Sequence, residues 1–401
     1  MVIPRPCLAY LGLLLMLVAG LPAARAQIFK LPPPDTTAGN FFGVAVALDG
    51  DRALVGASGA GSCGENAGAA YLYERDPARN EWRLQARLLP SDCKAGQFFG
   101  RAVALSGDRA VVAAFRPFFS TALSNAVYVF EHNPVTGLWE ETARLTSNRT
   151  EEEGAFAASV ALDGDRLLVT AAGDPAGRRY GGAAYLFERE PGGRWKQQAR
   201  LTGDDDLRYG LFGTDGDLDG DRVVVAASTY FANRPGSIYL FERNPASGAW
   251  EKVARFGHID DFFISVDLSG DRVIVGESRD GPHGSGRATL FERNAEGRWQ
   301  QTATLAPTQP YKQGGFGTEV ALDGDRALVV GYDEQLSFEF NIDRVVYVFA
   351  YDPESRSWEQ KRILDVGEVA FGSAIDLDGP WALIGQASEQ KPGQVYLARL
   401  P

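Results

Sequence analysis

The sixteen residues from Phe42 to Ala57, FGVAVALDGDRALVGA, decide the fold of this chain. Two apolar runs flank the Asp49-Gly50 pair, and the second alternates in the way that suits a half-buried strand. Asp-Gly is typical of a type I′ turn, in which both central residues take positive φ angles. The stretch therefore predicts a β-hairpin that turns at Asp49-Gly50.

The same hairpin pattern recurs along the rest of the chain. The residue after the turn glycine is Asp51, Asp108, Asp165, Asp221, Asp271, Asp325 or Pro380, at spacings of 57, 57, 56, 50, 54 and 55 residues. A period in this range indicates a repeat architecture, in which each repeat is one supersecondary unit.

Each repeat carries two further strand signals after its hairpin. An alternating aromatic run such as Tyr71-Leu72-Tyr73 comes first, and a tryptophan such as Trp82 then opens a fourth run. Six tryptophan runs serve seven hairpins, and the N-terminal stretch from Gln27 to Leu31 resembles the one from Gln85 to Leu89. We therefore predict an all-β, seven-bladed β-propeller of four-stranded blades, with the last blade closed by the N-terminal strand.

The stretch from Met1 to Ala26 is typical of a secretory signal peptide. It has Arg5 near its start, an apolar run from Leu8 to Gly20 and a small-residue exit at Ala24-Arg25-Ala26. The apolar run is shorter than the roughly 20 residues that a membrane helix needs. We expect no membrane span, and we expect residues 27–401 to form one propeller domain that is secreted to the periplasm or the extracellular space.

The charge of the chain argues against nucleic acid as a partner. The sequence has 40 basic and 52 acidic residues, and loss of Arg5 and Arg25 with the signal peptide leaves 38 − 52 = −14. An acidic surface repels phosphate backbones and anionic membranes alike.

The cysteines favour one disulfide bond. Cys7 leaves with the signal peptide, which leaves Cys63 and Cys93 in polar, glycine-rich segments. An even count in an oxidising compartment is ordinarily bridged. The alternative is a pair of free reactive thiols, which would need a stabilising cation nearby; Lys94 is adjacent, but Asp92 and Glu65 offset it.

The repeats also resemble a known family. The resemblance lies in Phe42-Gly43 with Gly56-Ala57-Ser58, and in the later pairs Phe99-Gly100, Phe212-Gly213, Phe316-Gly317 and Phe371-Gly372. These are similar to the Phe-Gly and Gly-Ala-Pro signatures of the FG-GAP repeat, which builds the propeller of integrin α subunits and many bacterial secreted proteins. The resemblance implies an extracellular propeller, with adhesion as the family's best-known use. Two copies depart from it, because Ala157 follows Phe156 and Phe263 follows Phe262.

Integrin propellers hold calcium in the loop between the first two strands of several blades, and here that loop has shrunk to a tight turn. We therefore expect no cofactor. Calcium remains an alternative at Asp215, Asp217 and Asp219, which superficially form a calcium loop. An EF-hand would want an acidic residue at the position of Ala226.

The loops on one rim are the predicted binding site, because Tyr, Phe and Arg tend to anchor interfaces. The candidate ligand-binding residues are Arg116, Phe118, Phe119, Arg178, Arg179, Tyr180, Tyr230, Phe231 and Arg234. From them we predict a binding or adhesion module, not an enzyme, that recognises an extracellular protein or glycan.

Two other functions stay open. A metal-dependent hydrolase or lyase would use the rim that carries His258 and His283, where aspartates also gather. A lectin-like propeller would stack sugars on the same rim aromatics.

Overall fold

The structure, a computed structural model, describes residues 28–115, 125–147, 156–173, 181–203, 211–228, 235–259, 264–279, 284–308, 314–332, 344–368 and 370–400. These residues form 28 β-strands. Blades one to three contain β2 (Phe42–Asp49), β3 (Arg52–Ala57), β4 (Ala69–Asp76) and β5 (Glu81–Leu88); β6 (Phe99–Ser106), β7 (Arg109–Ala114), β8 (Ala126–His132) and β9 (Trp139–Leu145); and β10 (Phe156–Asp163), β11 (Arg166–Ala171), β12 (Ala183–Arg189) and β13 (Trp195–Leu201).

Blades four to six contain β14 (Phe212–Asp219), β15 (Arg222–Ala227), β16 (Gly236–Arg243) and β17 (Trp250–Ile259); β18 (Ile264–Ser269), β19 (Arg272–Glu277), β20 (Arg287–Arg293) and β21 (Trp299–Leu305); and β22 (Val320–Asp323), β23 (Arg326–Tyr332), β24 (Arg344–Asp352) and β25 (Ser357–Leu364). Blade seven combines β26 (Phe371–Asp378), β27 (Trp381–Gln386) and β28 (Gln394–Arg399) with β1 (Ile28–Leu31).

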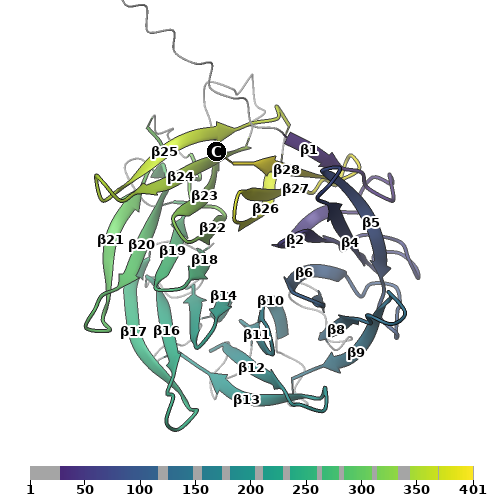
Figure 1. The fold of residues 1–401 in the computed structure, drawn as a ribbon, viewed down its shortest axis with the longest axis horizontal. Coiled ribbons are helices and arrows are strands. Elements are labelled where there is room, and N and C mark those ends of the chain that lie inside the picture. Colours follow the sequence, from purple (N-terminus) through teal and green to yellow (C-terminus); the bar gives the residue numbers. More distant parts are fainter. Residues whose placement is uncertain are drawn as a thin grey trace, which may run out of the picture.

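The seven sheets stand around a central axis, and the first strand of each hairpin lies innermost (Figure 1). In blades one to six the strands follow chain order from the axis outward, and in blade seven β1 takes the outermost place. Each strand pairs antiparallel with the next, as in blade one. This arrangement confirms the predicted seven-bladed propeller of four-stranded blades.

The N-terminal strand closes the ring. β1 pairs antiparallel with β28 over its whole length, from Ile28 opposite Ala398 to Leu31 opposite Val395. Leu31 is buried, as is Leu88 at the end of β5, the outer strand of blade one. The predicted closure is confirmed, and it covers the edge of β28 that would otherwise be unpaired.

The turn of the hairpin differs from the prediction. Asp49 pairs with Arg52, so the two turn residues are Gly50 and Asp51 rather than Asp49 and Gly50. Gly50 has a φ of 57°, and Asp51 is not among the residues with positive φ. A positive φ at the first central position alone is the pattern of a type II′ turn, which needs glycine there and accepts proline next, as at Pro380. The type I′ prediction was therefore wrong.

The Phe-Gly and Gly-Ala signatures meet across the boundary between blades. A Cβ on Gly56 of blade one would overlap the carbonyl oxygen of Gly100 of blade two. Glycine at both positions lets the two backbones touch. The phenylalanine of the signature packs edge-to-face on a tyrosine of the third strand, as Phe42 does on Tyr71 with ring centroids 5.8 Å apart.

The hydrophobic core is divided among the spaces between blades. Each cluster combines residues from two neighbouring sheets, such as Val55 of blade one with Leu383 of blade seven. Stability therefore depends on every blade having a neighbour on both sides. None of the described residues forms a helix long and apolar enough to cross a membrane.

Candidate functional site: the axial channel

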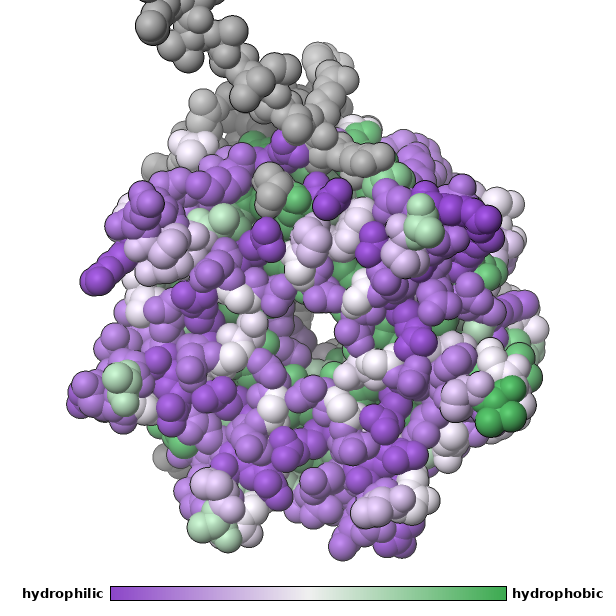
Figure 2. Space-filling model, in the orientation of Figure 1, coloured by the Kyte–Doolittle hydropathy of each residue, from purple (hydrophilic) through white to green (hydrophobic). Residues whose placement is uncertain are grey.

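The inner strands line a channel along the axis of the ring, and Figure 2 shows its opening near the middle of the molecule. Side chains on a strand alternate between its two faces, so every second residue of an inner strand points toward the inner strand of the next blade. Close to the axis, side chains from adjacent blades therefore meet at the wall of the channel.

In four blades this wall carries carboxyl groups. Asp215 and Asp217 lie on β14, Asp267 on β18 and Asp376 on β26, and Glu319 directly precedes β22. Each residue is only partly exposed. The inner strands of blades one to three have alanine where β14 has Asp217, namely Ala47, Ala104 and Ala161.

Four of these carboxyl groups bridge adjacent blades, those of Asp215, Asp217, Asp267 and Asp376. Asp217 accepts a hydrogen bond at Oδ2 from the backbone N–H of Leu268, at 2.9 Å. Asp267 accepts one in the same way from Leu322, at 2.6 Å. The same bridge runs from Val266 to Asp215, at 3.0 Å, and from Leu48 to Asp376, at 2.6 Å.

Burial raises the pKa values of these groups, because a carboxylate in the narrow channel loses hydration. The pKa rises to about 6 for Asp215, about 7 for Asp376 and about 8 for Glu319. Burial raises the pKa of both Asp217 and Asp267, and the negative charge of Asp217 raises the pKa of Asp267 further.

The charges also act across the axis. Burial is the largest cause of the raised pKa of Asp376 in blade seven, and the negative charge of Asp217 in blade four raises this pKa further. Two guanidinium groups, those of Arg344 and Arg101, oppose the upward shift of Glu319. Arg101 lies exposed on β6, on the inner wall, and desolvation lowers its pKa. The channel thus combines a group of carboxyls with an accessible cation.

At the hairpin end of the ring, residues of the repeated Asp-Gly-Asp-Arg motif hydrogen-bond each blade to the next. Asp49 accepts a hydrogen bond from the N–H of Gly107 in the following turn. Arg52 donates to the carbonyl oxygen of Gly107 and to Asp108, both at 2.8 Å. In every other blade pair the N–H of the turn glycine donates in the same way to the preceding blade: Gly164 to Ser106, Gly220 to Asp163, Gly270 to Asp219, Gly324 to Ser269, Gly379 to Asp323 and Gly50 to Asp378.

The three aspartates predicted to hold calcium lie on one strand. Asp215 and Asp219 are four residues apart, about 13 Å on an extended strand, while calcium ligands lie about 2.3–2.6 Å from the ion. No three His, Cys, Asp or Glu side chains of the described residues are grouped to hold a metal ion. Calcium at Asp215, Asp217 and Asp219 stays a prediction.

The predicted rim site lies outside the described residues. This holds for Arg116, Phe118, Phe119, Arg178, Arg179, Tyr180, Tyr230, Phe231 and Arg234, and for His283. His258 falls within β17. Recognition through this rim stays a prediction.

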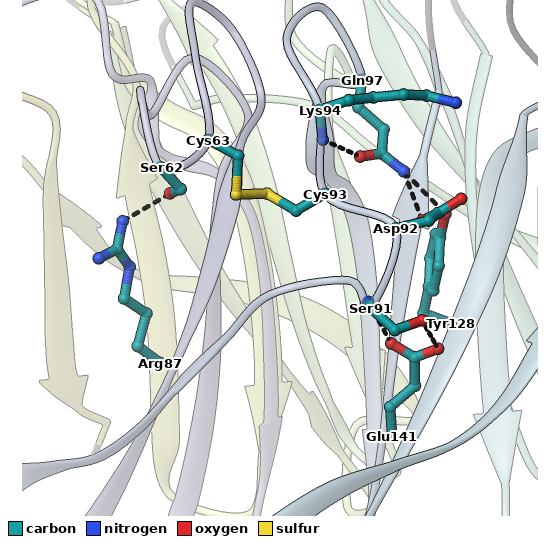
Figure 3. The surroundings of a disulfide bond; sticks show 10 residues. All are labelled: Ser62, Cys63, Arg87, Ser91, Asp92, Cys93, Lys94, Gln97, Tyr128 and Glu141. Carbon is teal, nitrogen blue, oxygen red and sulfur yellow. Dashed lines mark hydrogen bonds between the residues drawn. A yellow bond between two sulfur atoms is a disulfide. The ribbon is translucent and has the colours of Figure 1, made fainter.

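The predicted disulfide bond between Cys63 and Cys93 is confirmed (Figure 3). The two Cα atoms are 5.9 Å apart, and the bond ties the segment after β3 to the one between β5 and β6. Beside it, Asp92 accepts hydrogen bonds from the Tyr128 hydroxyl at 2.5 Å and from Gln97 Nε2 at 3.0 Å. The disulfide bond therefore lies beside a polar network that reaches blade two.

Sequence reasoning missed the channel as a site. Asp217 aligns with Asp267 and Asp376 among the repeats, which is a visible signal, but these residues read as isolated polar substitutions in apolar strands. Glu319 likewise aligns with Asp215, since each stands six residues before the residue that follows the turn glycine, whereas Arg101 has no charged counterpart among the channel residues. Only closure of the ring brings the five carboxyls to one axis.

Comparison with protein families identifies the chain. A model of the FG-GAP repeat matches residues 26–73, 82–130, 139–187 and 195–241. Each match combines an outer strand with the first three strands of the following blade, and in the first match β1 takes the outer position. The chain is an FG-GAP repeat protein, folded as a seven-bladed β-propeller.

Solved structures share this architecture at low sequence identity. A protein from Lactobacillus plantarum matches with a TM-score of 0.53 and 14% identity, over 83% of this chain and 88% of that one. A periplasmic gluconolactonase from Pseudomonas aeruginosa matches with a TM-score of 0.51 and 16% identity, over 89% and 88%. A putative 6-phosphogluconolactonase from Bacteroides fragilis matches with a TM-score of 0.52 and 13% identity, over 87% and 89%. Comparison with curated proteins found no match.

These neighbours correct one prediction. The expectation that the chain is not an enzyme was wrong, because two propellers with similar folds are named as lactonases. The error was to take rim aromatics and arginines as evidence for binding alone, when one fold can host both binding proteins and enzymes. At these identities the likeness itself shows the fold alone.

Proposed function

We propose that this chain is exported and binds a positively charged group of an extracellular protein in its axial channel. The proposal rests on the set of carboxyl groups in the channel, those of Asp215, Asp217, Asp267, Glu319 and Asp376. A cation entering the channel would replace the protons that these groups hold and would relieve their mutual repulsion.

Two further features support an extracellular setting. The disulfide between Cys63 and Cys93 is typical of proteins outside the cytoplasm. The stretch from Met1 to Ala26 has the composition of a signal peptide. The acidic charge of the mature chain also favours approach of a basic partner.

Calorimetric titration with a short lysine-containing peptide tests this proposal, with the same peptide acetylated at lysine as the matched ligand. We expect binding of the charged peptide that strengthens from pH 6 to pH 8, as the channel carboxyls lose protons. An Asp217→Asn, Asp376→Asn double variant should bind more weakly, and an Asp163→Asn variant, altered at the hairpin end, should bind as the parent does. Equal affinity for both peptides would contradict the proposal.

A second candidate function is hydrolysis of a cyclic ester. The observation that favours it is the pair of pKa values near neutrality, about 7 for Asp376 and about 8 for Glu319, which suit general acid–base catalysis. A carboxylate would take a proton from water as the water oxygen attacks the lactone carbonyl. The ring C–O bond would then break, the leaving oxygen would be protonated, and the Arg101 guanidinium would stabilise the oxyanion.

A pH-stat assay with gluconolactone tests this second candidate, since gluconolactonase is the activity for which one structural neighbour is named. Ring opening faster than the uncatalysed rate, and slowed by both Asp376→Asn and Glu319→Gln, is the expected result. A rate equal to the background at every pH between 6 and 9 would reject it.

A further inference from the structure

Arg101 is the one basic residue on the described inner strands, which are β2, β6, β10, β14, β18, β22 and β26. It stands on a bulge of β6, because the pairing with β7 passes directly from Phe99 to Ala102. A bulge bends a strand and re-aims the side chain that it carries. The fold does not need an arginine at this point, since the third residue from the repeat phenylalanine is uncharged in the other blades: Val44, Ala158, Thr214, Ile264, Thr318 and Ser373.

Among the described residues, the guanidinium of Arg101 has no ion-pair partner. The residue is exposed, and no hydrogen bond joins its side chain to the described part of the chain. Its charge acts across the ring on Glu319, because burial raises the pKa of that carboxyl and the guanidinium groups of Arg344 and Arg101 oppose the shift. Blades two and six, which carry Arg101 and Glu319, stand on opposite sides of the axis (Figure 1). At the hairpin end, by contrast, Arg52 pairs with Asp108 at 2.8 Å.

The two signs of charge lie on different walls of the channel. The carboxyl groups stand on blades four to seven, and the guanidinium stands on blade two. A simple anion would be repelled by carboxylates that outnumber the single arginine. A simple cation would leave Arg101 unpaired and would be repelled by it. A ligand that carries both charges is complementary to both walls.

The places of these charges along the axis set the length of the ligand. Arg101 is the third residue from the phenylalanine of its repeat, whereas Asp217 and Asp376 are the sixth. Three residues of extended strand span roughly 10 Å. The cation therefore lies nearer the end of the channel where the inner strands begin, and the aspartates lie deeper. A lysine at the C-terminus of a chain has its ammonium on a flexible four-carbon stem beside its α-carboxylate, so it presents both charges along one direction.

We propose that the channel receives a C-terminal lysine of its partner, with the ammonium among the carboxyls of blades four to seven and the α-carboxylate paired with Arg101. This inference rests on the proposed binding of a positively charged group and names the chemistry around that group. The guanidinium offers two parallel N–H donors to a carboxylate, which is the geometry of a strong charge-assisted pair. A chain end also enters a channel enclosed by seven blades more readily than a loop, which would have to pass two strands through it.

Calorimetric titration of the full mature chain with two peptides tests the inference. Both are acetyl-Gly-Gly-Lys, one with a free α-carboxylate and the other with a C-terminal amide. We expect the parent protein to bind the free acid at least about 10-fold more tightly, since a hydrogen bond to a charged group is among the stronger ones. Arg101→Gln should bind both peptides alike, and Arg101→Lys should keep part of the preference because it keeps the charge but not the paired donors. Arg356→Gln is the matched control, because Arg356 is exposed in the turn between β24 and β25, and its preference should equal that of the parent.

The outcomes separate this inference from the proposed function. Equal or tighter binding of the amide by the parent protein would overturn the C-terminal assignment while leaving the binding of a cation intact. Binding of neither peptide would overturn both. A preference for the free acid that persists in Arg101→Gln would assign the carboxylate to another group and would equally refute the role of Arg101. Free lysine is the third ligand, and tighter binding of free lysine than of the free-acid peptide would assign the channel to an amino acid and not to a chain end.

Discussion

The strand that closes the ring offers the sharpest test of how this propeller is held together. β1 contributes Leu31, which is 1% exposed, to the core between blades seven and one. Phe29 packs on Trp381 with ring centroids 6.1 Å apart, and Tyr73 of blade one donates a hydrogen bond to Pro32 O at 2.6 Å. The strand therefore joins the two ends of the chain through its backbone, its side chains and the residue that follows it.

The structure sets the size of the effect. Leu31→Ala should lower the free energy of unfolding by about 2–5 kcal/mol, which is the usual cost of emptying a buried leucine site. Deleting residues 28–31 removes the same buried side chain, partly exposes Trp381 and leaves the outer edge of β28 unpaired, while β28 still pairs with β27. The deletion should therefore cost more than the point substitution.

Urea unfolding followed by tryptophan fluorescence measures both changes. Leu364→Ala is the matched control, because Leu364 ends the outer strand of blade six and is 2% exposed, but its blade is continuous in the chain. We expect Leu31→Ala and Leu364→Ala to lose similar stability, and the deletion alone to expose a sheet edge and promote association. A deletion variant that unfolds at the parent midpoint would refute the closure.

Three further predictions concern the glycines of the repeat motif, the disulfide bond and bound cations. Gly56→Ala should destabilise the fold strongly, because the added Cβ would overlap Gly100. Gly50→Ala has no atom within 4 Å of the added Cβ, so it should cost only the roughly 1–2 kcal/mol of a non-glycine residue with a left-handed backbone. Equal losses of thermal stability in the two variants would contradict the contact between blades. The protein purified without reductant should weigh about 2 Da less than its reduced form, and free thiols in that material would refute the disulfide bond. The Cys63→Ser, Cys93→Ser double variant should lose about 3 to 4 kcal/mol of unfolding free energy, because the bond closes a loop of 30 residues. Chelator should barely change the melting temperature, since the hairpin turns leave no room for a calcium cage; a fall of more than about 10 °C would mean that a bound ion stabilises the fold.

Most of the fold was predictable because the repeat is local. The Phe-Gly, Asp-Gly-Asp-Arg and aromatic signals each mark one strand or turn, and seven copies at a nearly constant spacing leave few architectures open. The closing strand was predictable for the same reason, since Gln27 to Leu31 matches the outer-strand pattern. The turn type was harder to predict, because the sequence Asp49-Gly50-Asp51 allows either Asp49-Gly50 or Gly50-Asp51 as the two turn residues. Only the pairing of Asp49 with Arg52 decides between them.

The channel was decided by tertiary structure alone. Asp217, Asp267 and Asp376 are separated by 50 and 109 residues in the chain, and each follows an ordinary strand pattern. Their raised pKa values depend on how much water reaches them and on which charges face them, and both depend on where the ring places seven inner strands around one axis. The sequence determines which residues belong to an inner strand, but only closure of the ring determines which of them lie close together. Desolvation and charge repulsion depend on distance in space and not on separation along the chain.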